Sequence, residues 1–128
     1  MKKVLIINAE YYTQINKILL KNTIKNLNKS KIKHSTIKVT GVFEIPVIVA
    51  KYAKKFDAFI ALGCVIKGQT PHFDFISYSS TEAIIKLSVK NKKPIGNGII
   101  TCLNMRQAIA RKKKGREAAQ AVISVLSQ

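Results

Sequence analysis

The chain has 128 residues, of which 47% are hydrophobic, and 23 Lys and Arg against six Asp and Glu give it a formal net charge of +17. This length predicts one domain over residues 1–128, which buries roughly two thirds of its unfolded surface, and the hydrophobic content argues against disorder. The chain's two cysteines are too few for a disulfide framework or a cysteine-based zinc site, so we interpret Cys64 and Cys102 as buried or half-buried free thiols.

The first half of the chain predicts two strands and two helices. Residues 3–8 (KVLIIN) have the pattern of a short buried strand, and residues 34–40 alternate like a second one. A helix is predicted over 13–28, where apolar residues recur at spacings of three and four with lysines between them. Residues 44–54 predict a second helix, with Pro46 in its first turn.

The second half contains the most apolar run, 57–66 (DAFIALGCVI), which predicts a central strand covered on both faces. A long helix is predicted over 73–90 and another strand over 94–101, although the composition PIGNGIIT is irregular for a strand. Two shorter helices are predicted over 104–111 and 114–126.

Strands therefore alternate with helices, which is typical of an α/β fold. We expect a three-layer α/β/α sandwich with a four-stranded, mostly parallel sheet flanked by helices. Ligands of such sheets bind beyond the carboxyl ends of the strands. The loops to consider begin at Ala9, Gly41, Lys67 and Thr101.

The unit ALGCVIKGQTPHFDF gives the strongest local signal. Gly68 allows close approach of the backbone to a ligand, and the N–H groups of Gln69 and Thr70 lie near a helix start, which favours anions. His72 lies beside that anion position, where an imidazole can transfer protons near neutral pH. The alternative is a helix capped by Thr70 with an incidental histidine.

Two further segments follow predicted strands. In GVFEIP, Phe43 and Glu44 could hold a ring and a hydroxylated tail, or they could simply start a helix with Phe43 in the core. Tyr11 and Tyr12 follow the first strand, where a flat heterocycle would stack on one of them, or one of them would pack against the sheet edge.

Cations are concentrated at two places. Arg111, followed by three lysines, could hold a phosphate in a bidentate way, or these cations could face the dipole at a helix end. The lysines of residues 17–33 suit nucleic-acid binding, steering of small anions, or a solvated surface, and charge alone does not decide among these. His34 starts a predicted edge strand among them, and we expect it at the surface.

No apolar run reaches the length of a membrane span, and the N-terminal residues lead directly into a strand pattern rather than a signal peptide. We therefore expect the protein in the cytoplasm.

Taken together, these segments resemble the lumazine synthase family over almost the whole chain. The matching stretches are GVFEIP at 41–46, ALGCVIKGQTPHFD at 61–74, NGIIT at 97–101, QAIAR at 107–111 and KKGREAA at 113–119. The resemblance implies a flavodoxin-like fold assembled as homopentamers, sometimes as sixty-subunit shells, with active sites shared between neighbouring subunits. It also makes riboflavin synthase a candidate partner, and no membrane or nucleic acid is expected as a partner.

The resemblance further implies condensation of 5-amino-6-(D-ribitylamino)uracil with 3,4-dihydroxy-2-butanone 4-phosphate to 6,7-dimethyl-8-ribityllumazine, without a metal or other cofactor. By position, His72 matches the proton-transfer histidine. The resemblance assigns binding of the sugar phosphate to Gln69, Thr70, Arg111 and Lys114. For the ribitylaminouracil, Tyr11 matches the aromatic residue that stacks on the ring. The other residues assigned to binding of this substrate are Val42, Phe43, Glu44, Cys64, Val65, Ile66 and Asn97.

The chain departs from the family pattern at several positions. Asn97 stands where many members have an aromatic residue, and Glu10 and Tyr12 replace a usual Arg and Asn. The stretch between Arg111 and Lys114 is shortened, and we expect the first strand without the family's usual N-terminal extension before it. Other interpretations are a noncatalytic flavin or lumazine carrier, an RNA-binding domain, and an archaeal-type riboflavin synthase, whose motifs match less well.

Overall fold

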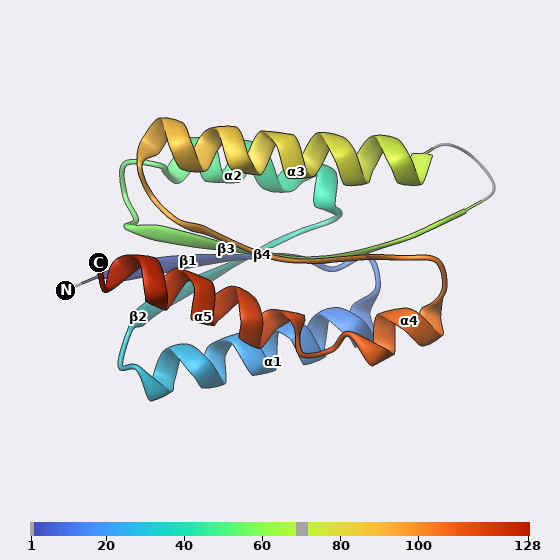
Figure 1. Cartoon of the computed structure of the whole chain (residues 1–128), viewed down its shortest axis with the longest axis horizontal. Coiled ribbons are helices and arrows are strands. Elements are labelled where there is room, and N and C mark those ends of the chain that lie inside the picture. The colour runs from blue at the N-terminus through green and yellow to red at the C-terminus, as the bar shows by residue number, and fades with distance from the viewer. Residues whose placement is uncertain (1, 69–71) are drawn as a thin grey trace.

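The computed structural model describes residues 2–68 and 72–128 and contains a four-stranded sheet between two layers of helices (Figure 1). The sheet is parallel throughout, in the order β2-β1-β3-β4. The predicted α/β/α sandwich is thus confirmed. The strands are β1 (Lys3–Ala9), β2 (Lys33–Val39), β3 (Ala58–Ile66) and β4 (Ile95–Cys102). The helices are α1 (Thr13–Lys29), α2 (Ile45–Tyr52), α3 (His72–Asn91), α4 (Met105–Ala110) and α5 (Lys114–Leu126), with a 3₁₀ turn η1 (Val42–Glu44) before α2.

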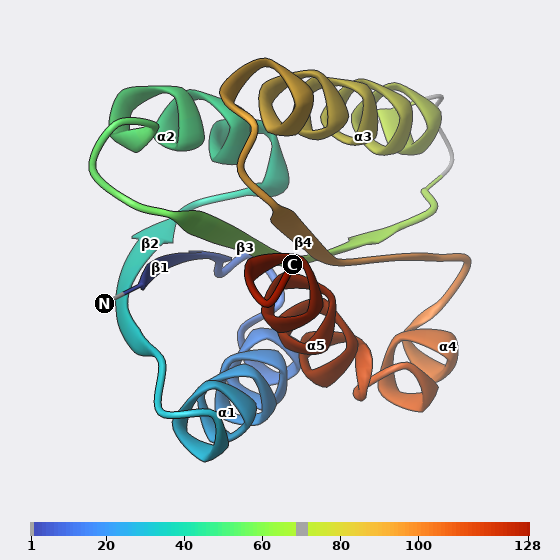
Figure 2. The ribbon, with the colours of Figure 1, turned by 60° about the vertical axis from the view of Figure 1, so that its left-hand side comes forward.

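The two helix layers bury opposite sides of the same strands. Figure 2 shows α2 and α3 on one side of the sheet and α1, α4 and α5 on the other. Along β1, Val4 and Ile6 pack with α1 and α5, whereas Leu5 and Ile7 belong to the cluster under α2 and α3. Every residue of β3 except Ile66 is buried, as expected of a central strand covered on both faces. Burial of each large aliphatic side chain contributes roughly 1.5–3 kcal/mol.

The glycines of β4 explain why its sequence is irregular for a strand. A Cβ atom on Gly96 would collide with the backbone carbonyl of Ala118 in α5, and one on Gly98 would lie 2.5 Å from Leu62 Cδ2. Similarly, a Cβ on Gly115 would collide with the backbone of Leu19 in α1. Gly96 and Gly115 therefore allow α5 to pack closely against β4 and α1.

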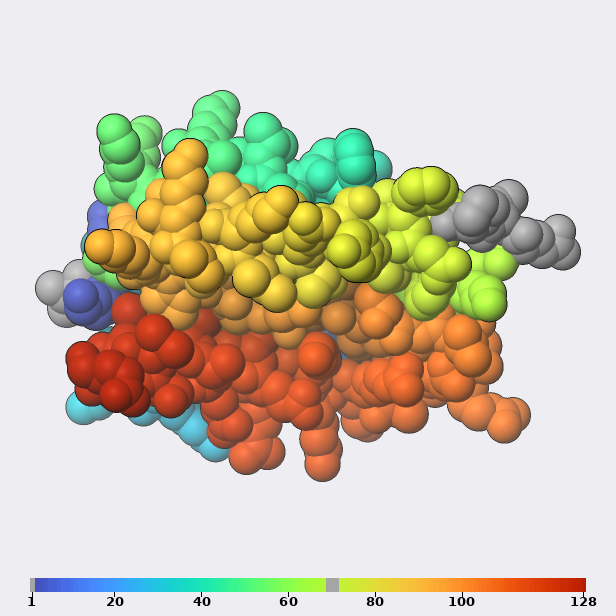
Figure 3. Space-filling model, turned by 45° about the horizontal axis from the view of Figure 1, so that its top comes forward, coloured from blue at the N-terminus to red at the C-terminus, as the bar shows by residue number. Residues whose placement is uncertain are grey.

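The outer surface of α3 carries large apolar side chains. Phe75, Tyr78, Ile85 and Val89 are between 58% and 72% exposed and lie three, seven and four residues apart. In Figure 3 this helix, drawn in yellow, runs uncovered across the visible face of the molecule. Among the helices of the described residues, none is long and apolar enough to cross a membrane.

Candidate functional site

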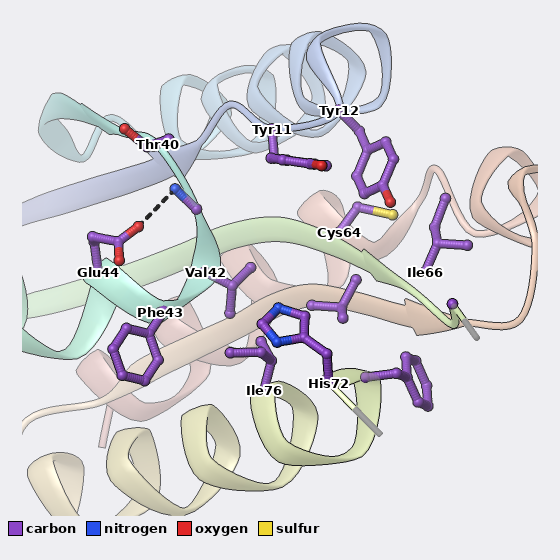
Figure 4. Close-up of a pocket in the computed structure, with 14 residues that line it drawn as sticks. Tyr11, Tyr12, Thr40, Val42, Phe43, Glu44, Cys64, Ile66, His72 and Ile76 are labelled. Atoms are coloured by element: carbon purple, nitrogen blue, oxygen red, sulfur yellow. Dashed lines mark hydrogen bonds between the residues drawn. The ribbon is translucent and has the colours of Figure 1, made fainter. Parts of the chain in front are cut away.

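A cavity of about 640 Å³ opens at the carboxyl ends of β1 and β3 (Figure 4). The cavity lies between four parts of the chain: the residues that follow β1, those that follow β2, the end of β3, and the start of α3. Its lining consists of Tyr11, Tyr12, Thr40, Gly41, Val42, Phe43, Glu44, Cys64, Val65, Ile66, Gly68, His72, Phe73 and Ile76. The parallel sheet brings these segments together because every strand ends at the same edge.

Two tyrosines form one wall of this cavity. Tyr11 is 72% exposed, and its ring meets that of Tyr12 in an edge-to-face contact with centroids 4.9 Å apart and planes at 76°. Tyr12 is half-buried, and its ring points toward Cys64 in Figure 4. Burial is the main cause that raises the pKa of Tyr12, followed by the neighbouring Tyr11. Tyr12 therefore stays a neutral phenol, and the wall of two rings is suited to contact with a flat ring.

The segment 41–44 forms the opposite wall. Glu44 Oε1 accepts a hydrogen bond from the backbone N–H of Gly41 at 3.0 Å, which holds the carboxylate at the rim of the cavity. Phe43 is 68% exposed, so the interpretation that placed it in the core is wrong, and Val42 is the buried residue. The reason is the tight turn η1, which directs Val42 inward and Phe43 outward.

The end of β3 forms the floor of the cavity. Cys64 and Ile66 contribute to the core cluster under α1 and α5, whereas Val65 belongs to the cluster on the other side of the sheet. Cys64 and Cys102 are buried free thiols, as expected. Burial, with the nearby Cys102 as a further cause, raises the pKa of the Cys64 thiol to about 12. The floor therefore presents a neutral, weakly polar sulfur.

His72 is the first residue of α3, and its imidazole is exposed and directed into the cavity near Val42 and Ile76 (Figure 4). The structure therefore places a group that can move protons opposite the tyrosine wall. Gln69 and Thr70, expected at the phosphate loop, lie outside the described residues.

Arg111 and Lys114 line a second cavity of about 460 Å³, which shares no lining residue with the first within residues 2–68 and 72–128. Arg111 Nη1 donates a hydrogen bond to the carbonyl oxygen of Thr101 at the end of β4, at 3.4 Å. Lys113 and Glu117 also line this cavity. His72 is the first residue of α3, and Arg111 is the C-cap residue of α4, and these two helices cover opposite sides of the sheet (Figure 2).

Two other residues singled out in the sequence lie outside both cavities. Asn97 is exposed on β4, and its Oδ1 accepts a hydrogen bond from the N–H of Ile99 at 3.0 Å. Ile99, two residues further along β4, lines the second cavity. His34 lies on the edge strand β2, half-buried, with its ring 3.0 Å from Asn28 Oδ1.

Sequence reasoning missed several lining residues. Thr40, Phe73 and Ile76 line the first cavity and Glu117 the second. Phe73 and Glu117 lie within stretches that match the family, but the sequence assigned a binding role to none of the four. Tyr12 was recognisable only as one of two tyrosines of which either could stack. Within residues 2–68 and 72–128, no three His, Cys, Asp or Glu side chains are grouped so that they could hold a metal ion.

Comparison with known proteins identifies similar sequences over the full length. A family model described as 6,7-dimethyl-8-ribityllumazine synthase matches residues 1–128. The 6,7-dimethyl-8-ribityllumazine synthase 1 of Rhodopseudomonas palustris is 40% identical over 136 residues, which cover 97% of this chain and 83% of that protein. The 6,7-dimethyl-8-ribityllumazine synthase of Sphingopyxis alaskensis is 40% identical over 134 residues, covering 99% and 94%. That of Cutibacterium acnes is 39% identical over 133 residues, covering 98% and 80%.

Proposed function

The chain belongs to the 6,7-dimethyl-8-ribityllumazine synthase family, transferases of riboflavin biosynthesis, and we propose that it carries out the family's reaction in a site completed by a second copy of the chain. The observation that carries this proposal is the cavity that holds two tyrosines, Glu44 and His72. It offers a stacking surface, a carboxylate and a proton carrier in one volume of about 640 Å³, which is within the range of small-molecule sites.

The ribitylaminouracil occupies this first cavity in our proposal. Its flat pyrimidine stacks on Tyr11 and rests on the end of β3, formed by Cys64, Val65 and Ile66. Its ribityl chain extends along Val42 and Phe43 toward Glu44, whose carboxylate accepts hydrogen bonds from hydroxyl groups. The bond from Gly41 to Glu44 Oε1 supports this orientation, because Oε2 remains for the polyol.

The phosphate of the second substrate is bound by the Arg111 side of a neighbouring copy. Arg111 and Lys114 line the second cavity, and a guanidinium binds a phosphate through two parallel hydrogen bonds. Gln69 and Thr70 are proposed to add the phosphate contacts that the family resemblance implies. Asn97, which the family resemblance assigns to the ribitylaminouracil, lies within β4 and lines neither cavity of the same chain.

In the reaction, the amine of the pyrimidine condenses with the ketone of the sugar phosphate and releases water. Elimination then expels phosphate, and closure of the ring with the second nitrogen releases another water. His72 accepts and returns the protons that these steps move, and Arg111 stabilises the departing phosphate. Orientation of two bound substrates supplies much of the acceleration, and none of the steps transfers electrons to a cofactor.

We propose a homopentamer as the assembly. The exposed apolar side chains of α3 support an association of copies, because large exposed apolar patches mark interaction surfaces. The number five is what the family resemblance implies. A sixty-subunit shell and an association with riboflavin synthase are further possibilities that the family resemblance implies. We also propose the cytoplasm as the location, since both cysteines are free thiols, which is usual in a reducing compartment.

The direct test is incubation of the purified protein with both substrates while the absorbance and fluorescence of the lumazine are followed. We expect product that depends on both substrates and a stoichiometric release of phosphate. Tight lumazine binding without turnover would refute the proposal and favour the carrier interpretation. Native mass measurement determines the assembly separately.

A further inference from the structure

Tyr12 occupies a helix position that a tyrosine does not favour. It is the N-cap residue of α1, and its side chain makes no capping hydrogen bond. Ser, Thr, Asp or Asn are preferred at this position, because their oxygen accepts a hydrogen bond from the first turn. Such local departures occur mainly at functional sites, where the residue serves something other than folding.

The contacts of Tyr12 indicate what that role is. Its backbone is fixed, because its carbonyl oxygen accepts the N–H of Asn16 at 3.0 Å. Its ring packs against the core cluster that contains Cys64, and it meets the ring of Tyr11 edge to face at 4.9 Å. Tyr12 is thus anchored in the fold, whereas Tyr11 is 72% exposed.

We propose that Tyr12 is a positioning residue that holds the Tyr11 ring in the orientation needed to stack on the pyrimidine. This inference rests on the proposed function, which assigns stacking to Tyr11. An exposed ring that rotates freely must be ordered when a ligand binds, and that ordering weakens affinity. An edge-to-face contact with an anchored neighbour orders the ring beforehand and leaves it lining the cavity.

The test measures binding of 6,7-dimethyl-8-ribityllumazine, KM for each substrate and melting temperature for Tyr12→Phe, Tyr12→Ala and Tyr12→Ser. We expect Tyr12→Phe to bind like the wild type, because the ring is kept. Tyr12→Ala and Tyr12→Ser should both weaken lumazine binding by about 2- to 12-fold, which is the range of an aromatic pair contact. KM for the sugar phosphate should not change.

Comparison of Tyr12→Ala with Tyr12→Ser distinguishes an effect on the position of the Tyr11 ring from an effect on the stability of the fold. Serine caps α1 and should melt at a higher temperature than alanine, yet the two variants should bind the lumazine equally. In a Tyr11→Ala background, Tyr12→Ala should cause no further loss.

Any of three results would overturn the proposal. The first is lumazine affinity that falls in parallel with melting temperature across the variants. The second is a Tyr12→Phe variant that binds lumazine as weakly as Tyr12→Ala, and the third is a loss of affinity from Tyr12→Ala that adds to that of Tyr11→Ala. A wild-type chain that does not bind the lumazine would instead overturn the proposed function, and this inference with it.

Discussion

The separation of His72 and Arg111 into two cavities predicts that inactive variants restore each other's activity when they assemble together. Alone, His72→Ala should lower kcat by about 10²- to 10⁴-fold, as expected for loss of a proton-transfer group. Arg111→Ala should raise KM for the sugar phosphate by about 10- to 150-fold, since a charged hydrogen bond to phosphate is lost. At sugar phosphate concentrations below KM, each variant should therefore retain about a tenth of the activity or less.

The size of the recovery follows from the geometry. If each site takes His72 from one copy and Arg111 from its neighbour, random assembly of an equal mixture leaves each residue intact in half of the sites. About one quarter of the sites then hold both residues, so the mixture should recover about a quarter of the wild-type activity. The assay follows lumazine formation after the two variants have been denatured and refolded together, against a mixture combined without exchange of subunits.

A mixture of the wild type with the double variant His72→Ala/Arg111→Ala provides the control. Sites shared between copies again leave about one quarter of the sites intact, whereas sites within one chain leave about one half. No recovery between the single variants, together with one half in this control, would refute the shared site.

Three further predictions follow from the fold, the thiol and the charge. Gly96→Ala should lower the free energy of unfolding by about 1–3 kcal/mol, because its Cβ collides with the backbone of Ala118; an unchanged denaturation midpoint would contradict the close approach of α5. Burial raises the pKa of Cys64 from 9.0 to about 12, so the neutral thiol favours the folded state. The stability that this thiol contributes is complete below pH 9 and is lost as the pH rises from 9 to 12. Cys64→Ala should therefore show a smaller decrease in melting temperature at alkaline pH than the wild type. Finally, the net charge of +17 should attract the sugar phosphate, so kcat/KM for it should fall as salt is added, and a constant value would exclude steering.

The fold could be predicted from the sequence largely because its signals are local. The apolar run 57–66 and the spacing of apolar residues in 13–28 each indicate one element, and alternation of the two types indicates a parallel sheet. The glycines of β4 are different. Gly96 and Gly98 weaken the strand pattern, and only the packing of α5 against them shows why they are there.

The site was less accessible to sequence reasoning, because a motif gives the order of residues but not the direction of their side chains. Spacing alone could not decide whether Phe43 or Val42 is buried, since the turn η1 sets that direction. Nor could it choose between Tyr11 and Tyr12, which both line the cavity in different ways. Spacing also could not show that Arg111 and His72 lie in separate cavities of one chain; only the family resemblance, which implies sites shared between subunits, pointed to this.

The topology explains why one chain does not bring these two residues into one cavity. α3 leads into β4 from one side of the sheet, and the chain leaves β4 toward α4 and α5 on the other side (Figure 2). His72 at the start of α3 and Arg111 at the end of α4 therefore belong to opposite helix layers. A second copy that presents its Arg111 side to the first cavity removes this restriction, and the apolar face of α3 gives copies a surface on which to associate. In our proposal assembly is thus a condition of catalysis, because an isolated chain holds the pyrimidine side of the site without the arginine that binds phosphate.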